Sequence, residues 1–113
     1  MRLLIVEDEN DIAKKVEATC VSDGFICHIA ETGTDALEML KIYDYETVIL
    51  DLMLPDINGF EVLSRIRSIK NATPIVVLSG LSATDDKVKC LTMGADDYLT
   101  KPFSKFELMA RIY

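Results

Sequence analysis

Residues 47–55 are TVILDLMLP, a short apolar run that ends in one carboxylate and is soon stopped by proline. A β-branched run of this length, bounded by a breaker, predicts a buried strand of a parallel sheet that is covered on both faces. Asp51 would be costly to bury inside such a strand, but not at its end, where water, a cation or a ligand can reach it. Asp51 is therefore the first candidate for a functional residue.

The composition narrows the class of protein. With 113 residues, 50% of them apolar, the chain predicts a single domain with one core. The 19 acidic residues outnumber the 12 basic ones and give a net charge of −7, which argues against a surface that binds nucleic acid. The sequence contains no stretch that predicts a membrane span or a signal peptide. The cysteines are odd in number and widely spaced, as expected of reduced intracellular thiols: Cys20, Cys27 and Cys90.

Strand and helix patterns alternate along the chain in five pairs. The predicted strands are residues 3–6, 25–30, 47–50, 75–78 and 97–100. Each is followed by apolar residues at helical spacing, and the helices are expected to start near residues 9, 32, 58, 84 and 104. Strict alternation predicts an α/β fold with a doubly wound parallel sheet, helices on both faces and right-handed crossovers.

Each predicted helix has an expected inner face. In chain order these faces are Ile12, Val16 and Cys20; Ala36, Leu37, Leu40 and Tyr43; Val62, Leu63, Ile66 and Ile69; Val88 and Leu91; and Leu108, Met109 and Ile112. On the third helix, Arg65, Arg67 and Lys70 are expected to point outward. The fourth helix has the thinnest apolar face, so we expect it to be held least firmly.

Polar side chains follow four of the strands where their carboxyl ends meet, which is where ligands bind in such sheets. They are Glu7, Asp8, Asp51, Ser79 and Lys101. Two carboxylates ~5 Å apart repel by about 3 kcal/mol at an effective dielectric of about 20, so the acids need a counter-charge. Hard oxygen ligands favour Mg²⁺ or Mn²⁺, and Lys101 would supply a second positive charge.

An acid beside a metal ion and a lysine can carry out phosphoryl transfer. Asp51 would be the nucleophile, the metal would neutralise charge, and Lys101 with Ser79 would hold the oxygens of the transferred group. The single histidine, His28, lies in the second predicted strand and is expected to be structural. The sequence therefore offers no Ser-His or Cys-His nucleophile pair at this edge.

The polar residues above, with LPDING at 54–59 and GADDYLTKPF at 94–103, closely resemble the receiver domain of bacterial two-component response regulators. The resemblance spans almost the whole chain. The last two stretches are similar to the OmpR/PhoB class, and residues 41–45 and 78–80 are similar to cell-cycle regulators of alphaproteobacteria. The resemblance implies a flavodoxin-like, five-stranded parallel sheet in the order 2-1-3-4-5 with five helices.

The resemblance also assigns roles to the acids at the edge. It implies that Asp51 accepts a phosphoryl group from a histidine kinase or a histidine phosphotransferase. Asp8, Asp51 and the backbone carbonyl of Met53 would bind Mg²⁺ directly, and Glu7 would act through water.

A second set of implied roles concerns the phosphoryl oxygens and the response to them. Ser79 and Lys101 would bind those oxygens, and the Lys101–Pro102 bond would be cis. Tyr98 matches the aromatic switch that turns inward when Ser79 moves toward the phosphate. Met53 and Leu81 would flank the phosphoryl group, and because neither can orient a hydrolytic water, we expect a long-lived aspartyl phosphate.

The chain as a whole, residues 1–113, is expected to be the receiver domain of a longer cytoplasmic protein, cut within its last helix, with a DNA-binding output domain outside it. DNA would be bound only through that domain, and no membrane is expected as a partner. Phosphorylation would shift the fourth helix, fifth strand and fifth helix and favour a homodimer. The implied dimer contacts are Lys87, Asp97, Glu107 and Arg111. The domain would assist its own phosphorylation and dephosphorylation without turning over an external substrate.

Three rival interpretations differ in what the sequence says against them. A flavodoxin-like nucleotide binder is disfavoured because residues 7–11 after the first strand are mostly acidic. A phosphatase of the haloacid dehalogenase type would need a second aspartate where Met53 stands. A protein-interaction module on the receiver fold that works without phosphorylation remains as the alternative.

Overall fold

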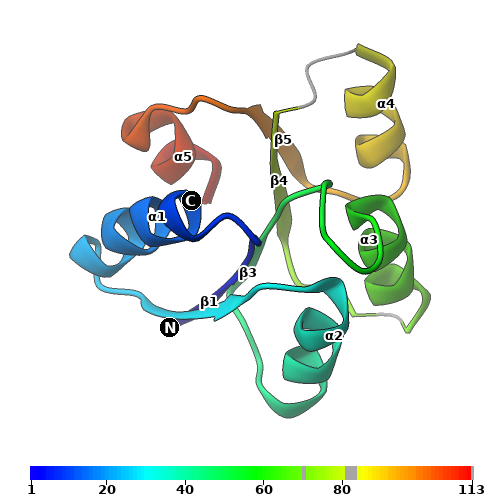
Figure 1. Cartoon of the computed structure of the whole chain (residues 1–113), viewed down its shortest axis with the longest axis horizontal. Coiled ribbons are helices and arrows are strands. Elements are labelled where there is room, and N and C mark those ends of the chain that lie inside the picture. Colours follow the sequence, from blue (N-terminus) through cyan, green and yellow to red (C-terminus); the bar gives the residue numbers. More distant parts are fainter. Residues whose placement is uncertain (70, 81–83, 113) are drawn as a thin grey trace.

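The computed structural model describes residues 1–69, 71–80 and 84–112. Within them, five parallel strands form one sheet in the order β2-β1-β3-β4-β5 (Figure 1). The strands are β1 (Arg2–Val6), β2 (Ile26–Ala30), β3 (Thr47–Leu50), β4 (Ile75–Ser79) and β5 (Asp97–Thr100). The predicted α/β architecture and strand order are confirmed.

Helices cover both faces of the sheet. They are α1 (Asn10–Ser22), α2 (Gly33–Ile42), α3 (Gly59–Ser68), α4 (Thr84–Thr92) and α5 (Lys105–Ile112). Figure 1 shows α1 and α5 on one side of the sheet and α2, α3 and α4 on the other. This is the arrangement that right-handed crossovers between parallel strands produce.

Two apolar clusters fill the spaces between the sheet and its helices. Leu4 and Leu50 belong to the cluster beneath α2 and α3. Leu3 and Ile49, their neighbours in the chain, belong to the cluster beneath α1. Successive side chains of a strand point to opposite faces, so both faces of the central strands need apolar residues. This is why Val48, Ile49 and Leu50 of β3 are all apolar.

Two predicted inner-face residues lie at helix ends and are exposed instead. Tyr43 is 39% exposed and Ile69 is 62% exposed, so their predicted burial was wrong. Both occupy the C-cap position, of α2 and α3 respectively, where the backbone leaves the helix. Helical periodicity therefore no longer says which way their side chains point.

The inner face of α4 also differs from the prediction. Val88 is 55% and Leu91 is 41% exposed, whereas Cys90 is fully buried. Among the described residues of α4, Cys90 is the buried one. The ammonium of Lys89 lies 4.1 Å from the centre of the Phe60 ring on α3, which adds a cation–π contact between the helices. The apolar face of α4 is thin, as the sequence indicates, but its buried residue is Cys90 instead of Val88 or Leu91.

The remaining sequence expectations concern groups away from the site. His28 lies on β2, where its Nδ1 is 2.8 Å from the Tyr45 hydroxyl and its ring packs against Tyr43 and Tyr45, so its predicted structural role is confirmed. The three cysteines are free thiols. Lys70, which was expected to point outward, lies outside the described residues. In the described ranges, every helix is too short or too polar to cross a membrane.

Candidate functional site

The ladder hydrogen bonds extend past the strands and align the residues that follow them. The amide of Glu7 donates to the carbonyl of Ala30, and the amide of Asp51 donates to the carbonyl of Val6, each at 3.0 Å. Between β4 and β5, the amide of Lys101 donates to the carbonyl of Ser79 at 2.8 Å. The backbone thus brings the predicted polar residues to one edge.

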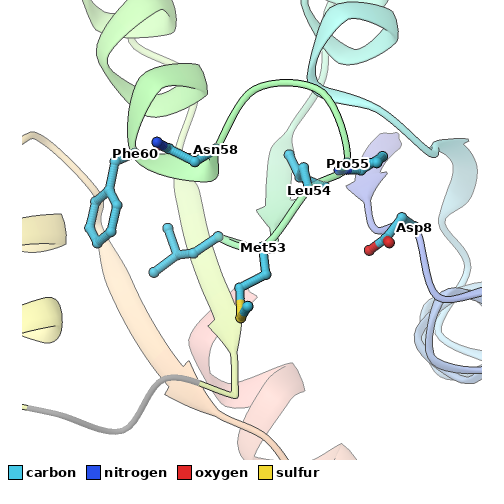
Figure 2. Close-up of a pocket in the computed structure, with 7 residues that line it drawn as sticks. Asp8, Met53, Leu54, Pro55, Asn58 and Phe60 are labelled. Atoms are coloured by element: carbon cyan, nitrogen blue, oxygen red, sulfur yellow. The ribbon is translucent and has the colours of Figure 1, made fainter.

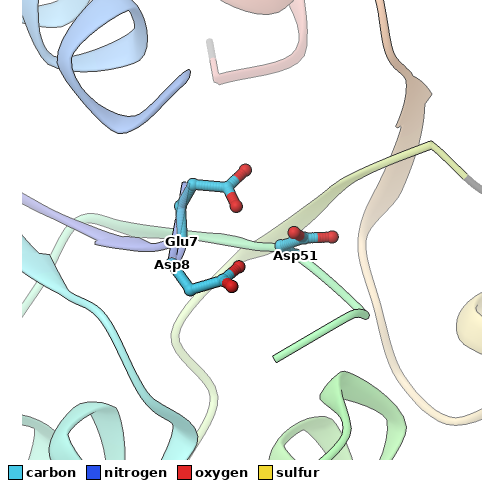
Figure 3. Close-up of side chains that lie close together, drawn as sticks. All are labelled: Glu7, Asp8 and Asp51. Atoms are coloured by element: carbon cyan, nitrogen blue, oxygen red, sulfur yellow. The ribbon is translucent and has the colours of Figure 1, made fainter. Parts of the chain in front are cut away.

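Three carboxylates meet at this edge. Glu7, Asp8 and Asp51 each offer an oxygen, and these atoms lie within 4.8 Å of one another (Figure 3). Glu7 and Asp51 are buried, at 4% exposure each, whereas Asp8 is exposed. The cluster is therefore enclosed by protein on one side and open to solvent at Asp8.

Lys101 supplies the positive charge that the cluster needs. Its ammonium donates to Glu7 Oε1 at 2.5 Å and to Asp51 Oδ2 at 3.2 Å. Burial raises the pKa of Glu7 to about 7, partly offset by the hydrogen bond from Lys101. Burial alone would lower the pKa of Lys101, but the hydrogen bond to Glu7 and the charge of Asp51 raise it. Lys101 is therefore a fixed cation in contact with Asp51.

The other two predicted site residues, Ser79 and Tyr98, lie beside each other on β4 and β5. Ser79 is fully buried and Tyr98 is 4% exposed, so the tyrosine ring points inward. Burial raises the pKa of Tyr98, while a hydrogen bond with Ser79 acts in the opposite direction. The structure thus brings together the two residues of the predicted switch, and the Lys101–Pro102 bond is cis as expected.

The three carboxylates also fit a divalent cation. The cluster found among the described residues consists of carboxylates alone. Its donors are therefore hard oxygens of the kind that Mg²⁺ and Mn²⁺ prefer. Beside it lies a cavity of about 490 Å³, lined by Asp8, Met53, Phe60 and their neighbours (Figure 2). The fit therefore rests on the donor set together with an open route for solvent and ligands.

The loop from Asp51 to α3 approaches the backbone closely at Gly59. The amide of Gly59 donates to the carbonyl of Leu52 at 2.7 Å. A Cβ at position 59 would lie 2.4 Å from Leu52 Cα and 2.5 Å from the carbonyl oxygen of Asp51. Any side chain there would push the backbone of Asp51 and Leu52 out of place, so glycine is required by this contact.

A residue that the sequence analysis missed, Asp56, ties the same loop to α2. Its carboxylate accepts from the amides of Gly33 and Thr34 at 2.8 and 2.9 Å and from the Thr34 hydroxyl at 2.5 Å. These hydrogen bonds hold the pKa of Asp56 well below its usual range. An aspartate favours a helix N-terminus, but usually that of its own helix, so no local pattern pointed to this partner.

Arg67 was expected to point outward, and that prediction was wrong. Its guanidinium donates to the carbonyls of Gly94, Asn71 and Thr73 and to the carboxylate of Asp96. The fork of donors in an arginine suits such a set of acceptors. Arg67 therefore ties the end of α3 to the segments that lead into β4 and β5.

The predicted dimer contacts are placed on α4, β5 and α5. Lys87 and Glu107 are exposed. Arg111 and Asp97 form an ion pair with each other at 3.5 Å, so both already have a partner within the chain. Leu81, which was expected to flank the phosphoryl group, lies outside the described residues, whereas Met53 is 63% exposed beside the carboxylates.

Several known proteins are similar to this chain. The cell cycle response regulator CtrA of Brucella ovis is 46% identical over 113 residues, which is all of this chain and 49% of that protein. CtrA of Brucella anthropi matches equally well. The chain thus spans about half the length of these relatives. The similarity agrees with the resemblance to cell-cycle regulators seen in the sequence.

Solved structures agree with the fold throughout. The receiver domain of the Francisella response regulator 1452 has a TM-score of 0.94 at 33% identity, covering 98% of this chain and 92% of that one. The receiver domain of Klebsiella pneumoniae RstA has a TM-score of 0.93 at 27% identity, covering 99% and 95%. The model of the response regulator receiver domain family matches residues 3–113. With its carboxylate cluster and its strand order, this chain belongs to the response regulator receiver domain family.

Proposed function

We propose that Asp51 is the phosphoacceptor of this receiver domain and that a histidine of a partner kinase or phosphotransferase is the donor. The observation that carries the proposal is the surroundings of the Asp51 carboxylate. It is buried at the end of β3, 3.2 Å from the ammonium of Lys101 and within the cluster that includes Glu7 and Asp8. A carboxylate so placed is available as a nucleophile and faces a fixed cation.

In the proposed step, a carboxylate oxygen of Asp51 forms a bond to phosphorus while the bond from phosphorus to the donor histidine nitrogen breaks. The histidine leaves with the bonding electron pair. Lys101 and Ser79 bind the oxygens of the transferred group, where negative charge is concentrated. Because Lys101 is already held by Glu7 and Asp51, its charge is in place before the donor arrives.

Mg²⁺ or Mn²⁺, when bound, would neutralise charge on the transferred phosphoryl group. We expect Asp8, Asp51 and the carbonyl of Met53 to hold the ion directly and Glu7 to act through water. The amide of Met53 already donates to Asp51 Oδ1 at 3.2 Å, which keeps this part of the loop beside the acceptor.

The proposed output is a shift of α4, β5 and α5. Tyr98 is buried against Ser79, so a movement of Ser79 toward a phosphoryl group would change the contact between Ser79 and the tyrosine. α4 has little buried surface to lose when it moves. We propose that this face pairs with a second copy of the chain, using Lys87, Asp97, Glu107 and Arg111. The ion pair between Asp97 and Arg111 would have to be shared with that copy.

We also place the domain within a two-component system. It would be part of a cytoplasmic OmpR/PhoB-class regulator whose separate output domain binds DNA. In this role, the domain promotes its own phosphorylation and dephosphorylation and has no external substrate to turn over.

The test is intact-protein mass spectrometry after incubation with Mg²⁺ and acetyl phosphate. We expect one added phosphoryl group, lost in Asp51→Asn and after chelation of the metal. Asp44→Asn is the matched control, since it makes the same change in an exposed residue before β3, at the opposite end of that strand. It should take up the group normally.

Two results would count against the proposal. No mass increase in the unaltered chain, with Mg²⁺ bound, would favour the interaction module that works without phosphorylation. A mass increase that survives in Asp51→Asn would place the phosphoacceptor elsewhere.

A further inference from the structure

The loop between β3 and α3 carries Asp51 at its start and Met53 two residues later. Its two ends are fixed by the backbone. The amide of Asp51 continues the β1 ladder, and the amide of Gly59 bonds to the carbonyl of Leu52. The middle of the loop is more exposed: Met53 is 63% exposed, and Pro55 is also exposed. In this part of the loop, Asp56 forms side-chain hydrogen bonds to the start of α2.

The bonds of Asp56 complete the N-terminus of α2. The first amides of a helix lack partners inside the helix. In α2, the amide of Asp35 bonds to the Thr32 side chain, and those of Gly33 and Thr34 bond to Asp56. A carboxylate at the positive end of a helix gains both charge-assisted hydrogen bonds and the favourable dipole. Asp56 therefore joins the loop to a helix that packs on the sheet.

We propose that Asp56 is a positioning residue for the magnesium site: by bonding to the N-terminus of α2, it fixes the loop that presents Asp51 and the Met53 carbonyl. The inference rests on the part of the proposed function that has Asp8, Asp51 and the Met53 carbonyl hold Mg²⁺. Asp56 does not belong to the carboxylate cluster itself. Its effect is on where the loop backbone lies, and thus on how well the site is formed before the ion binds.

The experiment is a titration of the full chain with MgCl₂ alone, followed by amide NMR, which gives a Kd without any phosphodonor. We expect Asp56→Ala to raise the Kd of Mg²⁺ about fivefold, below the roughly tenfold or greater effect of groups that bond directly to a metal ligand. The amide signals of Met53 should also shift in the metal-free variant.

Thr32→Ala is the matched control. It removes a capping group from the same helix, since Thr32 accepts from the amide of Asp35, but it leaves the loop untouched. Its Kd should change less than about twofold, although its stability falls as helix caps predict. Equal Kd changes in the two variants would overturn the inference, because the effect would then come from destabilising α2.

A milder variant guards against poor folding of Asp56→Ala. Thr34→Val removes the hydroxyl donor and keeps both backbone bonds to Asp56, so the Kd should rise about twofold. A Kd that is unchanged in both Asp56→Ala and Thr34→Val would overturn the inference. Mg²⁺ binding without phosphoryl uptake by the unaltered chain would count against the proposed function and leave the inference standing. Absence of Mg²⁺ binding would overturn the inference together with the metal site.

Discussion

α3 and α4 cover the same face of the sheet, but they are attached to it very differently. α3 buries three fully enclosed aliphatic side chains, Val62, Leu63 and Ile66. It begins at a capped N-terminus, where Asn58 accepts from the amide of Glu61 at 3.0 Å. Arg67 then bonds its last turn to the segments before β4 and β5. α4 instead buries Cys90 and exposes Val88 and Leu91.

The difference shows which of the two helices is held more firmly. Each fully buried aliphatic side chain contributes about 1.5–3 kcal/mol, so α3 would lose several kcal/mol if it left its place. α4 would lose much less. In the proposed response, a phosphoryl group would have a few kcal/mol of differential affinity with which to shift a population, which would suffice to move α4 but not α3. α3 keeps the loop of Asp51 in position meanwhile.

The largest expected effect tests this contrast directly. Leu63→Ala should lower the free energy of unfolding by about 3 kcal/mol, because it leaves a cavity beneath α3. Val88→Ala on α4 should cost less than about 0.5 kcal/mol, because Val88 is already more than half exposed. Urea unfolding of both variants measures the two values. A similar loss in each would mean that α4 is packed as firmly as α3.

A second prediction concerns the charged contact between Glu7, which follows β1, and Lys101, which follows β5. Burial raises the pKa of Glu7 from 4.5 to about 7, so between these values the folded chain holds a proton that the unfolded chain releases. The free energy of unfolding should therefore fall as the pH rises, by about 2 kcal/mol between about pH 5 and about pH 7 in metal-free buffer.

The control for that titration is Glu7→Gln, which has no carboxyl group to ionise. The other titrating groups contribute to both proteins, so the difference between their stability curves isolates Glu7. Parallel curves for the two proteins would show that Glu7 ionises as it does in the unfolded chain.

The smallest expected effect is at the contact between the two helices. Lys89→Ala removes the cation over the Phe60 ring and should cost about 0.5 kcal/mol, as exposed cation–π contacts do. Amide hydrogen exchange should be faster within residues 84–92 and unchanged in α3. Lys87→Ala, an exposed lysine of the same helix, is the control. Equal exchange in both variants would show that the ring contact does not hold α4.

Much of the fold and of the site could be predicted from the sequence, for a topological reason. Apolar runs such as residues 47–50 can be buried only in a sheet covered on both faces, and parallel strands bring their carboxyl ends together. It was therefore enough to note which residues follow each strand. Asp8, Asp51 and Lys101 share one edge because of the strand order, whatever the details of packing.

The sequence was less informative where a side chain bonds to a distant part of the backbone. Arg67 and Asp56 are charged residues in polar surroundings, and nothing local distinguishes them from solvated ones. Asp56 bonds to a segment about 20 residues away, and Arg67 bonds to Asp96, about 30 residues away, as well as to nearby carbonyls. Cys90 was missed as the buried residue of α4 because the pattern favoured the larger apolar side chains of Val88 and Leu91.

The close approach at Gly59 has a consequence for protein engineering. Grafting this site onto another scaffold would usually begin with its charged residues, because those carry the chemistry. Yet a Cβ at position 59 would overlap the carbonyl oxygen of Asp51 itself, so the aspartate could not occupy its place without that glycine. A transplanted site therefore needs a glycine eight residues after the aspartate as much as it needs Lys101.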